Sequence, residues 1–333
     1  MLAVRLFARI EKLCGKHLPL ATLFQAPTVA QLADVLREEG WTAPWSSLVA
    51  IQARGHNARG KRPLFCVHAV GGNVIEYHGL ARHLGSDQPF YAFQSVGLDG
   101  RQAPLKSIPA MASHYIKEMR EVQPAGPYLL GGHSLGGMIA FEMACQLREQ
   151  GEQVDLIALL DAYPFSHDKL QPNANSRTYR ARRFAKRMKC HVENLLHLKG
   201  EEKFAYLLDK AQFAPAKIKQ QLWRITYRFR RFNRALPATL RNIEGLNFLA
   251  AREYVPRIYP GRVALFWASG DLTTSFDLLD GWRTLAAGGV DVHEISGNHI
   301  NIVKEPHVSA LADELRGCLD QPQEEQSATV RAA

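Results

Sequence analysis

The stretch that decides the fold is YLLGGHSLGG, residues 128–137. It begins with the apolar residues of a short strand and leads into an apolar helical pattern, MIAFEMA, residues 138–144. Glycine is tolerated where a turn is too tight for side chains, so the glycines on both sides of Ser134 predict a sharp turn between strand and helix. Such a turn places the serine at the carboxyl end of a strand, where open α/β sheets bind their ligands.

The pattern Gly132-x-Ser134-x-Gly136 between a strand and a helix is typical of the nucleophile elbow of α/β-hydrolases. The start of the following helix directs N–H groups and positive potential toward an oxyanion, so the Leu135 N–H is one expected donor. The second donor is expected after strand 64–67, where HAVGG offers the Val70 N–H. The alternatives are an incidental serine and a plain glycine-rich turn.

Short apolar runs recur from residue 63 onward and alternate with helical patterns. The predicted strands are 64–67, 90–93, 127–130, 154–160, 263–267 and 290–295, and the predicted helices are 73–84, 109–121, 136–150 and 306–319. Buried strands that alternate with helices predict a mostly parallel sheet covered on both faces. The expected class is therefore α/β, an α/β-hydrolase fold with a helical lid insertion and a short N-terminal helical segment.

A nucleophilic serine needs a general base, and His299 is the expected one. It lies in SGNHIN, residues 296–301, directly after the last predicted strand. The other histidines near motifs are worse placed. His68 is on the wrong loop, His133 is on the tight turn and points elsewhere, and His307 is expected in the first turn of a helix.

The base needs an acid to orient it, and in this fold the acid precedes the histidine in the chain. Asp161 ends the predicted strand 154–160, and Asp271 follows the next one. Both stand at carboxyl ends of parallel strands, and the spacing fits either. The residues alone therefore leave the acid open between the two.

The charge of the chain is concentrated in one segment. The whole chain has a net charge of +9, but residues 177–241 contain 18 Lys and Arg against 4 Asp and Glu, a net charge of +14. The remainder therefore has a net charge of −5. Solvated faces of lid helices are the plainest explanation, and attraction of a phosphate or an acidic partner is the functional one. The segment YRFRRF, residues 227–232, could stack on bases, but neither nucleic acid nor a membrane is the expected partner.

Several classes of protein are excluded by what the sequence lacks. No apolar run approaches the length of a transmembrane helix, and charges interrupt the N-terminal apolar residues, so no signal peptide is expected. The five cysteines are widely spaced and form no C-x-x-C pair, which argues for reduced thiols, a cytoplasmic location and no metal site.

Six short motifs together resemble a known family, the type I thioesterase domains that end nonribosomal peptide and polyketide synthases. The motifs are FCVHAVGG at 65–72, GHSLG at 132–136, LLD at 159–161, PRIYPG at 256–261, GNH at 297–299 and EPHV at 305–308. The resemblance covers roughly residues 62–318. It implies that the acid is Asp161, since the family carries it on the strand after the elbow, and that a helical lid occupies residues 166–250. Ala69 departs from the family, which often has proline there.

The N-terminal segment resembles the second half of a peptidyl or acyl carrier domain. Helices are predicted at 2–14 and 29–39, with Thr28 as the N-cap of the second, and LPLATLF, residues 18–24, as a loop with a short turn. No serine that could bear pantetheine precedes Leu2, so the segment is not loadable as written. A truncated gene, a late start or an excised piece would explain this.

These inferences predict four parts of the chain and one reaction. The parts are a partial carrier at 1–40, a linker at 41–61 with a short strand near 48–51, a thioesterase at 62–320 with its lid at 166–250, and a disordered tail at 321–333.

The expected function is release of an acyl or peptidyl chain from a carrier of an upstream synthase module. Release occurs by hydrolysis or cyclisation through an acyl-enzyme on Ser134, with no cofactor bound by the hydrolase itself. A stand-alone editing thioesterase, an esterase and a catalytically idle synthase remnant are the alternatives.

Overall fold

The computed structural model describes residues 2–16, 18, 22–26, 28–38, 46–53, 60–98, 102–164, 243–270 and 272–320. Most of the predicted lid, the basic segment 177–241 and the predicted tail lie outside these ranges. Within them, no helix combines the length and the apolar character needed to cross a membrane.

The centre of the molecule is a seven-stranded sheet with the order β1-β3-β2-β4-β5-β6-β7. The strands are β1 (Leu48–Gln52), β2 (Leu64–Val67), β3 (Phe90–Phe93), β4 (Tyr128–His133), β5 (Val154–Leu160), β6 (Val263–Ala268) and β7 (Val290–Ile295). Only the edge strand β1 is antiparallel to its neighbour, and the other strands pair in parallel. The predicted α/β class is confirmed.

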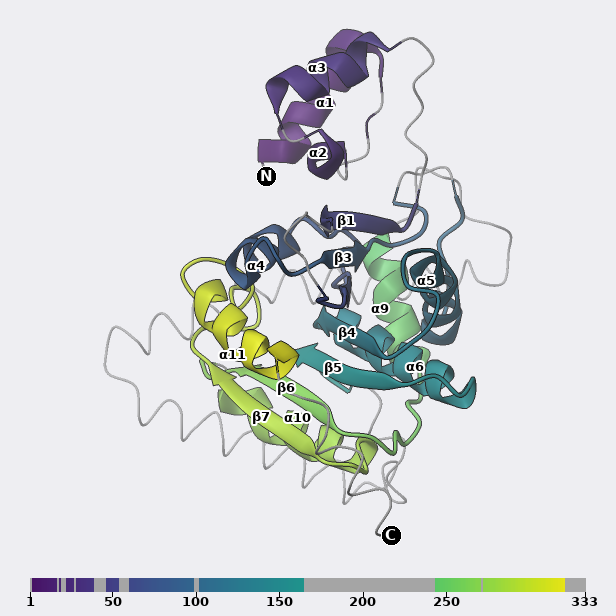
Figure 1. Cartoon of the computed structure of the whole chain (residues 1–333), viewed down its shortest axis with the longest axis vertical. Coiled ribbons are helices and arrows are strands. Elements are labelled where there is room, and N and C mark those ends of the chain that lie inside the picture. Colours follow the sequence, from purple (N-terminus) through teal and green to yellow (C-terminus); the bar gives the residue numbers. More distant parts are fainter. Residues whose placement is uncertain are drawn as a thin grey trace.

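Helices cover both faces of this sheet (Figure 1). One face carries α4 (Tyr77–Leu84) and α11 (Val308–Asp320), and the other carries α5 (Ile108–Val122), α6 (Leu135–Glu149), α9 (Ile243–Glu253) and α10 (Leu272–Leu285). Strand β2 shows why: Leu64 and Cys66 belong to the apolar cluster on the α4 side, whereas Phe65 and Val67 belong to the cluster on the α6 side. Alternate side chains of a strand point to opposite faces of the sheet. A strand with helices packed on both faces is therefore apolar along its whole length.

The structure corrects several element boundaries. Strand β4 continues beyond residue 130 to His133, which is paired with Leu160 of β5; glycine is rare in strands, so its two glycines hid this extension. Helix α4 begins at Tyr77 and not at 73, because the Asn73 side chain accepts a hydrogen bond from the Ile75 N–H at 3.2 Å and turns the chain. Helix α10 was not predicted.

Three helices precede the sheet: α1 (Leu2–Cys14), α2 (Thr22–Gln25) and α3 (Val29–Arg37). They share a small apolar cluster of their own, formed around Phe7, Leu18, Ala26 and Leu32. Thr28 caps α3 as predicted, with its hydroxyl accepting from the Gln31 N–H at 3.2 Å. The predicted loop at 18–24 contains the start of α2.

The N-terminal helices touch the rest of the molecule beside β1 (Figure 1). Phe24 of α2 lies 6.2 Å from the ring of His78 in α4, measured between ring centroids. Phe24 also packs against the apolar cluster on the α4 side of the sheet. The assignment of residues 1–40 to half of a carrier domain stays a prediction.

Candidate active site

Ser134 lies at the tip of the turn between β4 and α6. Its backbone has φ 56° and ψ −117°, a region that residues with side chains rarely occupy and that is often found at functional sites. A Cβ on Gly132 would lie 2.3 Å from the Gly136 carbonyl carbon, and a Cβ on Gly136 would lie 2.0 Å from the Val67 oxygen. The glycines of the motif are therefore a steric requirement of the turn.

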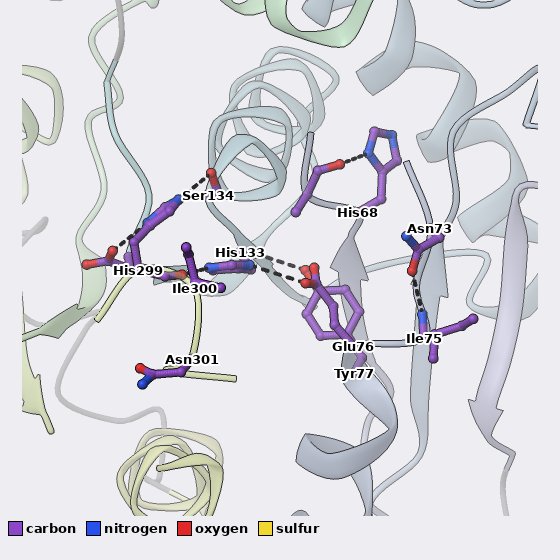
Figure 2. A network of polar contacts seen from close by, with 12 residues as sticks. His68, Asn73, Ile75, Glu76, Tyr77, His133, Ser134, His299, Ile300 and Asn301 are labelled. Atoms are coloured by element: carbon purple, nitrogen blue, oxygen red, sulfur yellow. Dashed lines mark hydrogen bonds and ion pairs between the residues drawn. The ribbon is translucent and has the colours of Figure 1, made fainter. Parts of the chain in front are cut away.

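His299 reaches Ser134 from the loop that follows β7 (Figure 2). Its Nε2 lies 3.0 Å from the Ser134 Oγ, and its Nδ1 lies 2.6 Å from Asp161 Oδ2. An ionised carboxylate only accepts hydrogen bonds, so the Nδ1–H donates to Asp161 and Nε2 is left to accept the serine proton. This tautomer is the one that a general base on the serine requires.

Asp161 is held at the end of β5 by backbone groups of β6. Its N–H donates to the Phe266 oxygen at 2.7 Å, and its Oδ1 accepts from the Ala268 N–H at 3.0 Å. The residue is 3% exposed and has φ 45°. Both carboxylate oxygens are thus engaged, one by β6 and one by His299. The alternative acid, Asp271, lies outside the described residues.

The two predicted oxyanion donors lie on separate segments beside Ser134. Leu135 is the first residue of α6, and Val70 is in the loop 68–72 after β2. No described residue accepts a hydrogen bond from either amide. The peptide that carries the Val70 N–H is fixed through its carbonyl, because Ala69 O accepts from the His68 Nδ1–H at 2.7 Å and from the Gly72 N–H at 2.9 Å.

His68 is itself held in one protonation state. Its Nε2 lies 2.9 Å from the Tyr115 hydroxyl, which must donate since the other ring nitrogen already carries the proton shared with Ala69. The ring is fully buried, and burial lowers the pKa of His68 from 6.5 to about 4. His68 is therefore a neutral anchor of the Val70 loop and not a base.

Asn247 is a contact of this site that the sequence analysis missed. It lies on α9, is fully buried, and donates from Nδ2 to the Val70 oxygen at 3.1 Å. A buried amide inside an apolar helix was the signal that could have revealed it, because buried polar groups are nearly always hydrogen-bonded. Tyr163 is a second missed contact, with its ring 5.1 Å from that of His299.

The other two rival histidines bond elsewhere. His307 accepts from or donates to the Ser296 hydroxyl at 3.1 Å. His133 precedes the serine, but its ring is directed toward Glu76 and the His299 backbone (Figure 2). Among the histidines that the structure describes, only His299 forms a hydrogen bond with Ser134.

In the part of the chain that the structure describes, neither a metal site nor the cavity beside α6 involves the triad residues. The described part of the chain contains no group of three His, Cys, Asp or Glu side chains arranged to hold a metal ion. A cavity of about 840 Å³ lies between α5, α6 and α9, where Gln146 and Tyr254 contribute to its lining. It adjoins the C-terminal half of α6, whereas Ser134 precedes the first residue of that helix, so no triad residue lines it.

Residues 62–319 match the family model described as "Thioesterase domain". Two curated relatives extend this likeness. The Dimodular nonribosomal peptide synthase of Bacillus subtilis (strain 168) is 44% identical over 164 residues, 49% of this chain. The Malpinin synthetase of Mortierella alpina is 32% identical over 301 residues, 90% of this chain. The chain spans only 7% and 3% of the lengths of these relatives.

A solved structure is also similar over nearly the whole chain. It is a four-domain nonribosomal peptide synthetase in its holo form, bound to AMP and glycine. The identity is 27% and the TM-score is 0.59, with 96% of this chain and 24% of that chain covered. The likeness therefore extends beyond the matched family segment toward the N-terminus.

Proposed function

Because this chain belongs to the thioesterase domain family, we propose that it releases an acyl or peptidyl chain from a phosphopantetheine carrier. The setting is nonribosomal peptide or polyketide biosynthesis, and release proceeds by hydrolysis or by cyclisation. The bond that breaks is the thioester between the chain and the pantetheine thiol. Membership of the family establishes the class, a serine thioesterase, and the release reaction is the proposal.

In the first half-reaction, Ser134 Oγ attacks the thioester carbonyl carbon while its proton moves to His299 Nε2. Asp161 keeps the His299 proton on Nδ1 and stabilises the imidazolium that forms. The N–H groups of Leu135 and Val70 donate to the tetrahedral oxyanion. When the oxyanion collapses, the carbon–sulfur bond breaks and His299 returns the proton to the leaving pantetheine thiolate. An ester on Ser134 remains.

In the second half-reaction, a nucleophile attacks this ester and His299 takes its proton. A water molecule gives a free acid, whereas an amine or hydroxyl of the bound chain itself gives a ring. The second oxyanion uses the same two N–H donors, and its collapse returns the proton to Ser134. The cycle needs no metal or redox cofactor, since every step moves only a proton and an acyl group.

One observation carries the proposal: three residues far apart in the sequence form a continuous hydrogen-bonded chain. Ser134 Oγ, His299 and Asp161 are linked by distances of 3.0 and 2.6 Å. They belong to three different loops at the carboxyl ends of parallel strands. Such geometry in a chain of this family supports an active enzyme over an idle synthase remnant.

The test is turnover of an acyl-pantetheine thioester by the full chain. Ser134→Ala is expected to lower kcat by roughly 10⁶, as loss of a triad nucleophile does elsewhere. Ser309→Ala is the matched control, because its hydroxyl donates to the Pro306 oxygen at the surface and, among the described residues, takes no part in the triad contacts. A fluorophosphonate probe should label Ser134 and no other serine by peptide mass spectrometry. Near-normal turnover by Ser134→Ala would end the proposal, and faster turnover of simple oxygen esters would favour an esterase.

We further propose that a carrier domain is the partner and that residues 1–40 are the C-terminal half of one. The alignment with the Malpinin synthetase, which covers 90% of the chain, supports this, as does the separate apolar cluster of α1, α2 and α3. A loaded carrier domain should give a higher kcat/KM than the free acyl-pantetheine thioester. Equal values would contradict recognition of the carrier itself.

We place the reaction in the cytoplasm, where such synthases would meet activated acyl substrates. The four described cysteines, Cys14, Cys66, Cys145 and Cys318, are free thiols, which fits a reducing compartment. Fractionation of cells that express the full chain tests the location, and recovery in the secreted fraction would contradict it.

A further inference from the structure

His133 immediately precedes the nucleophile, and its ring lies between two partners that the proposed reaction does not use. Figure 2 shows the ring between the main-chain oxygen of His299 and the carboxylate of Glu76. The His133 Nε2 lies 2.8 Å from the His299 oxygen, and its Nδ1 lies 3.5 Å from Glu76 Oε2. The His133 side chain is 6% exposed and that of Glu76 is 21% exposed.

The contacts of His133 determine where its ring protons lie. A carbonyl oxygen only accepts hydrogen bonds, so His133 Nε2 carries a proton. A neutral ring would then present the lone pair of Nδ1 to an ionised Glu76 inside the protein, where an unpaired arrangement of this kind is costly. The arrangement is favourable when a second proton lies between Nδ1 and the carboxylate. The contact of His133 Nδ1 with the half-buried Glu76 carboxylate therefore favours an imidazolium–carboxylate pair beside the nucleophile.

Other titratable groups around the ring do not change this assignment. The His299 ring lies 5.1 Å away between centroids, and Asp161 contributes a further negative charge. Burial lowers the pKa of His133, but the nearby carboxylate of Glu76, with smaller contributions from the His299 oxygen and Asp161, raises it more, so the pKa of His133 lies above its usual value. Tyr77 is fully buried, and burial raises its pKa; Cys66 and His68, which also face Glu76, are buried as well, so burial raises the pKa of the Cys66 thiol and lowers that of His68.

Tyr77, the residue after Glu76, forms a hydrogen bond with the backbone of His133. The Tyr77 hydroxyl accepts from the His133 N–H at 2.9 Å and donates to the Val67 oxygen at 2.5 Å. Two consecutive residues at the start of α4 thus hold His133 by its side chain and by its backbone. His133 in turn holds the backbone of His299, which sits on a loop without regular structure between β7 and α11.

We propose that Glu76 and protonated His133 form a positioning pair for the catalytic histidine. The pair holds the main-chain carbonyl of His299, so that the imidazole of the same residue stays between Asp161 and Ser134. The idea rests on the proposed function, because it assigns His299 the role of base. A displacement of a catalytic group by about 1 Å can lower a rate by about 10²-fold, so holding the loop has a direct effect on kcat.

Three substitutions separate positioning from bulk stability in the full chain. His133→Phe removes the donor to His299, and Glu76→Leu removes the carboxylate. Each is expected to lower kcat on an acyl-pantetheine thioester by roughly 10- to 100-fold, with KM changed less than threefold. Glu76→Gln is expected to recover kcat to within about threefold of the native value, because its amide can donate to Nδ1 and keep the proton on Nε2.

A matched control comes from a second histidine–carboxylate pair in the same domain. His293 Nδ1 lies 2.9 Å from Glu314 Oε2 at the surface, away from the triad. Glu314→Gln should leave both kcat and KM unchanged. Native kcat in His133→Phe, or a loss in Glu76→Gln as large as that in Glu76→Leu, would overturn the proposal. The proposal would also be overturned if kcat fell in His133→Phe and Glu76→Leu only in proportion to a drop in their melting temperatures, since a general loss of stability would then explain the loss of activity.

A nitrogen NMR measurement keeps this proposal separate from the proposed function. Spectra of ¹⁵N-histidine-labelled protein at pH 6.5, where a raised pKa favours the imidazolium, should show both ring nitrogens of His133 protonated in the native chain. The signal is assigned by its absence from His133→Phe. In Glu76→Leu, only one of the two ring nitrogens of His133 should be protonated. If no thioester is turned over at all, the proposed function fails, yet this result still decides whether the pair is charged. A neutral His133 in the native chain would overturn the pair.

Discussion

The two sides of Ser134 are built in different ways. On one side, the proposed acid Asp161 and base His299 contribute their own side chains, which meet at 2.6 Å and continue to the serine at 3.0 Å. On the other side, the proposed oxyanion donors are main-chain N–H groups of Leu135 and Val70. The loop that carries the Val70 N–H is held by the buried side chains of His68 and Asn247, which form no hydrogen bond with the serine in the described part of the chain.

The difference follows from what each side has to do. Moving a proton requires a side chain whose protonation can change, and such residues can be recognised by type and order in the sequence. Stabilising an oxyanion requires only that an N–H group points the right way, and any residue can supply one. The orientation of the Val70 peptide is set by His68, Tyr115 and Asn247 through hydrogen bonds to the loop or to each other.

The largest effect in this comparison is expected from breaking the proton-moving side. Asp161→Asn should lower kcat on an acyl-pantetheine thioester by about 10⁴, because the amide favours the wrong tautomer of His299. Asp271→Asn, which changes the alternative acid in the same way, should keep kcat near the native value. Steady-state kinetics of both variants measure this. A larger loss in Asp271→Asn would transfer the role of acid to that residue.

A smaller effect is expected from lowering the pH, which acts on stability through His68 on the oxyanion side. The fold holds His68 neutral with a pKa of about 4, so between that pH and 6.5 the unfolded chain binds more protons than the folded one. The contribution of His68 to the free energy of unfolding is therefore complete above pH 6.5. It is lost as the pH falls, by roughly 3 kcal/mol at pH 4. His68→Gln, which carries no charge at any pH, should lose that much less free energy of unfolding over this range.

Chemical denaturation at a series of pH values measures the effect of His68. The exposed residue His78 offers the control, and His78→Gln should follow the native curve. Parallel pH curves for His68→Gln and the native chain would show that His68 is not held neutral by the fold.

The smallest effect is expected from removing the hydrogen bond of Asn247 to the Val70 loop on the oxyanion side. Asn247→Ala removes the donor to the Val70 oxygen and should lower kcat by about tenfold with KM little changed, an energy close to that of one hydrogen bond. The measurement is kcat and KM on the same thioester, with Gln153→Ala, an exposed residue just before β5, as the control. A rise in KM at constant kcat would mean that Asn247 contributes to binding and not to orientation of the loop.

Much of the fold was predictable because its signals are local. The apolar runs located six of the seven strands of the sheet from residue 63 onward, and the short strand near 48–51 was expected as well. Errors arose where packing overrides local pattern. The glycines of β4 hid the last part of that strand, and α10 lacked a clear apolar period. The bounds of α4 depended on one hydrogen bond from Asn73.

The sequence by itself determined the class of the fold and pointed to the elbow at Ser134 and to His299 as the proposed base, because each depends on residue type, local period or chain order. It left the acid open between Asp161 and Asp271 until the family resemblance favoured the first. Only the tertiary structure showed that Asp161 is joined to His299, that His68 and Asn247 hold the Val70 loop, and that Glu76 faces His133. Apart from the bond between the neighbours His68 and Ala69, those contacts join residues from 57 to 177 positions apart, and no local pattern records which distant side chains a fold brings together.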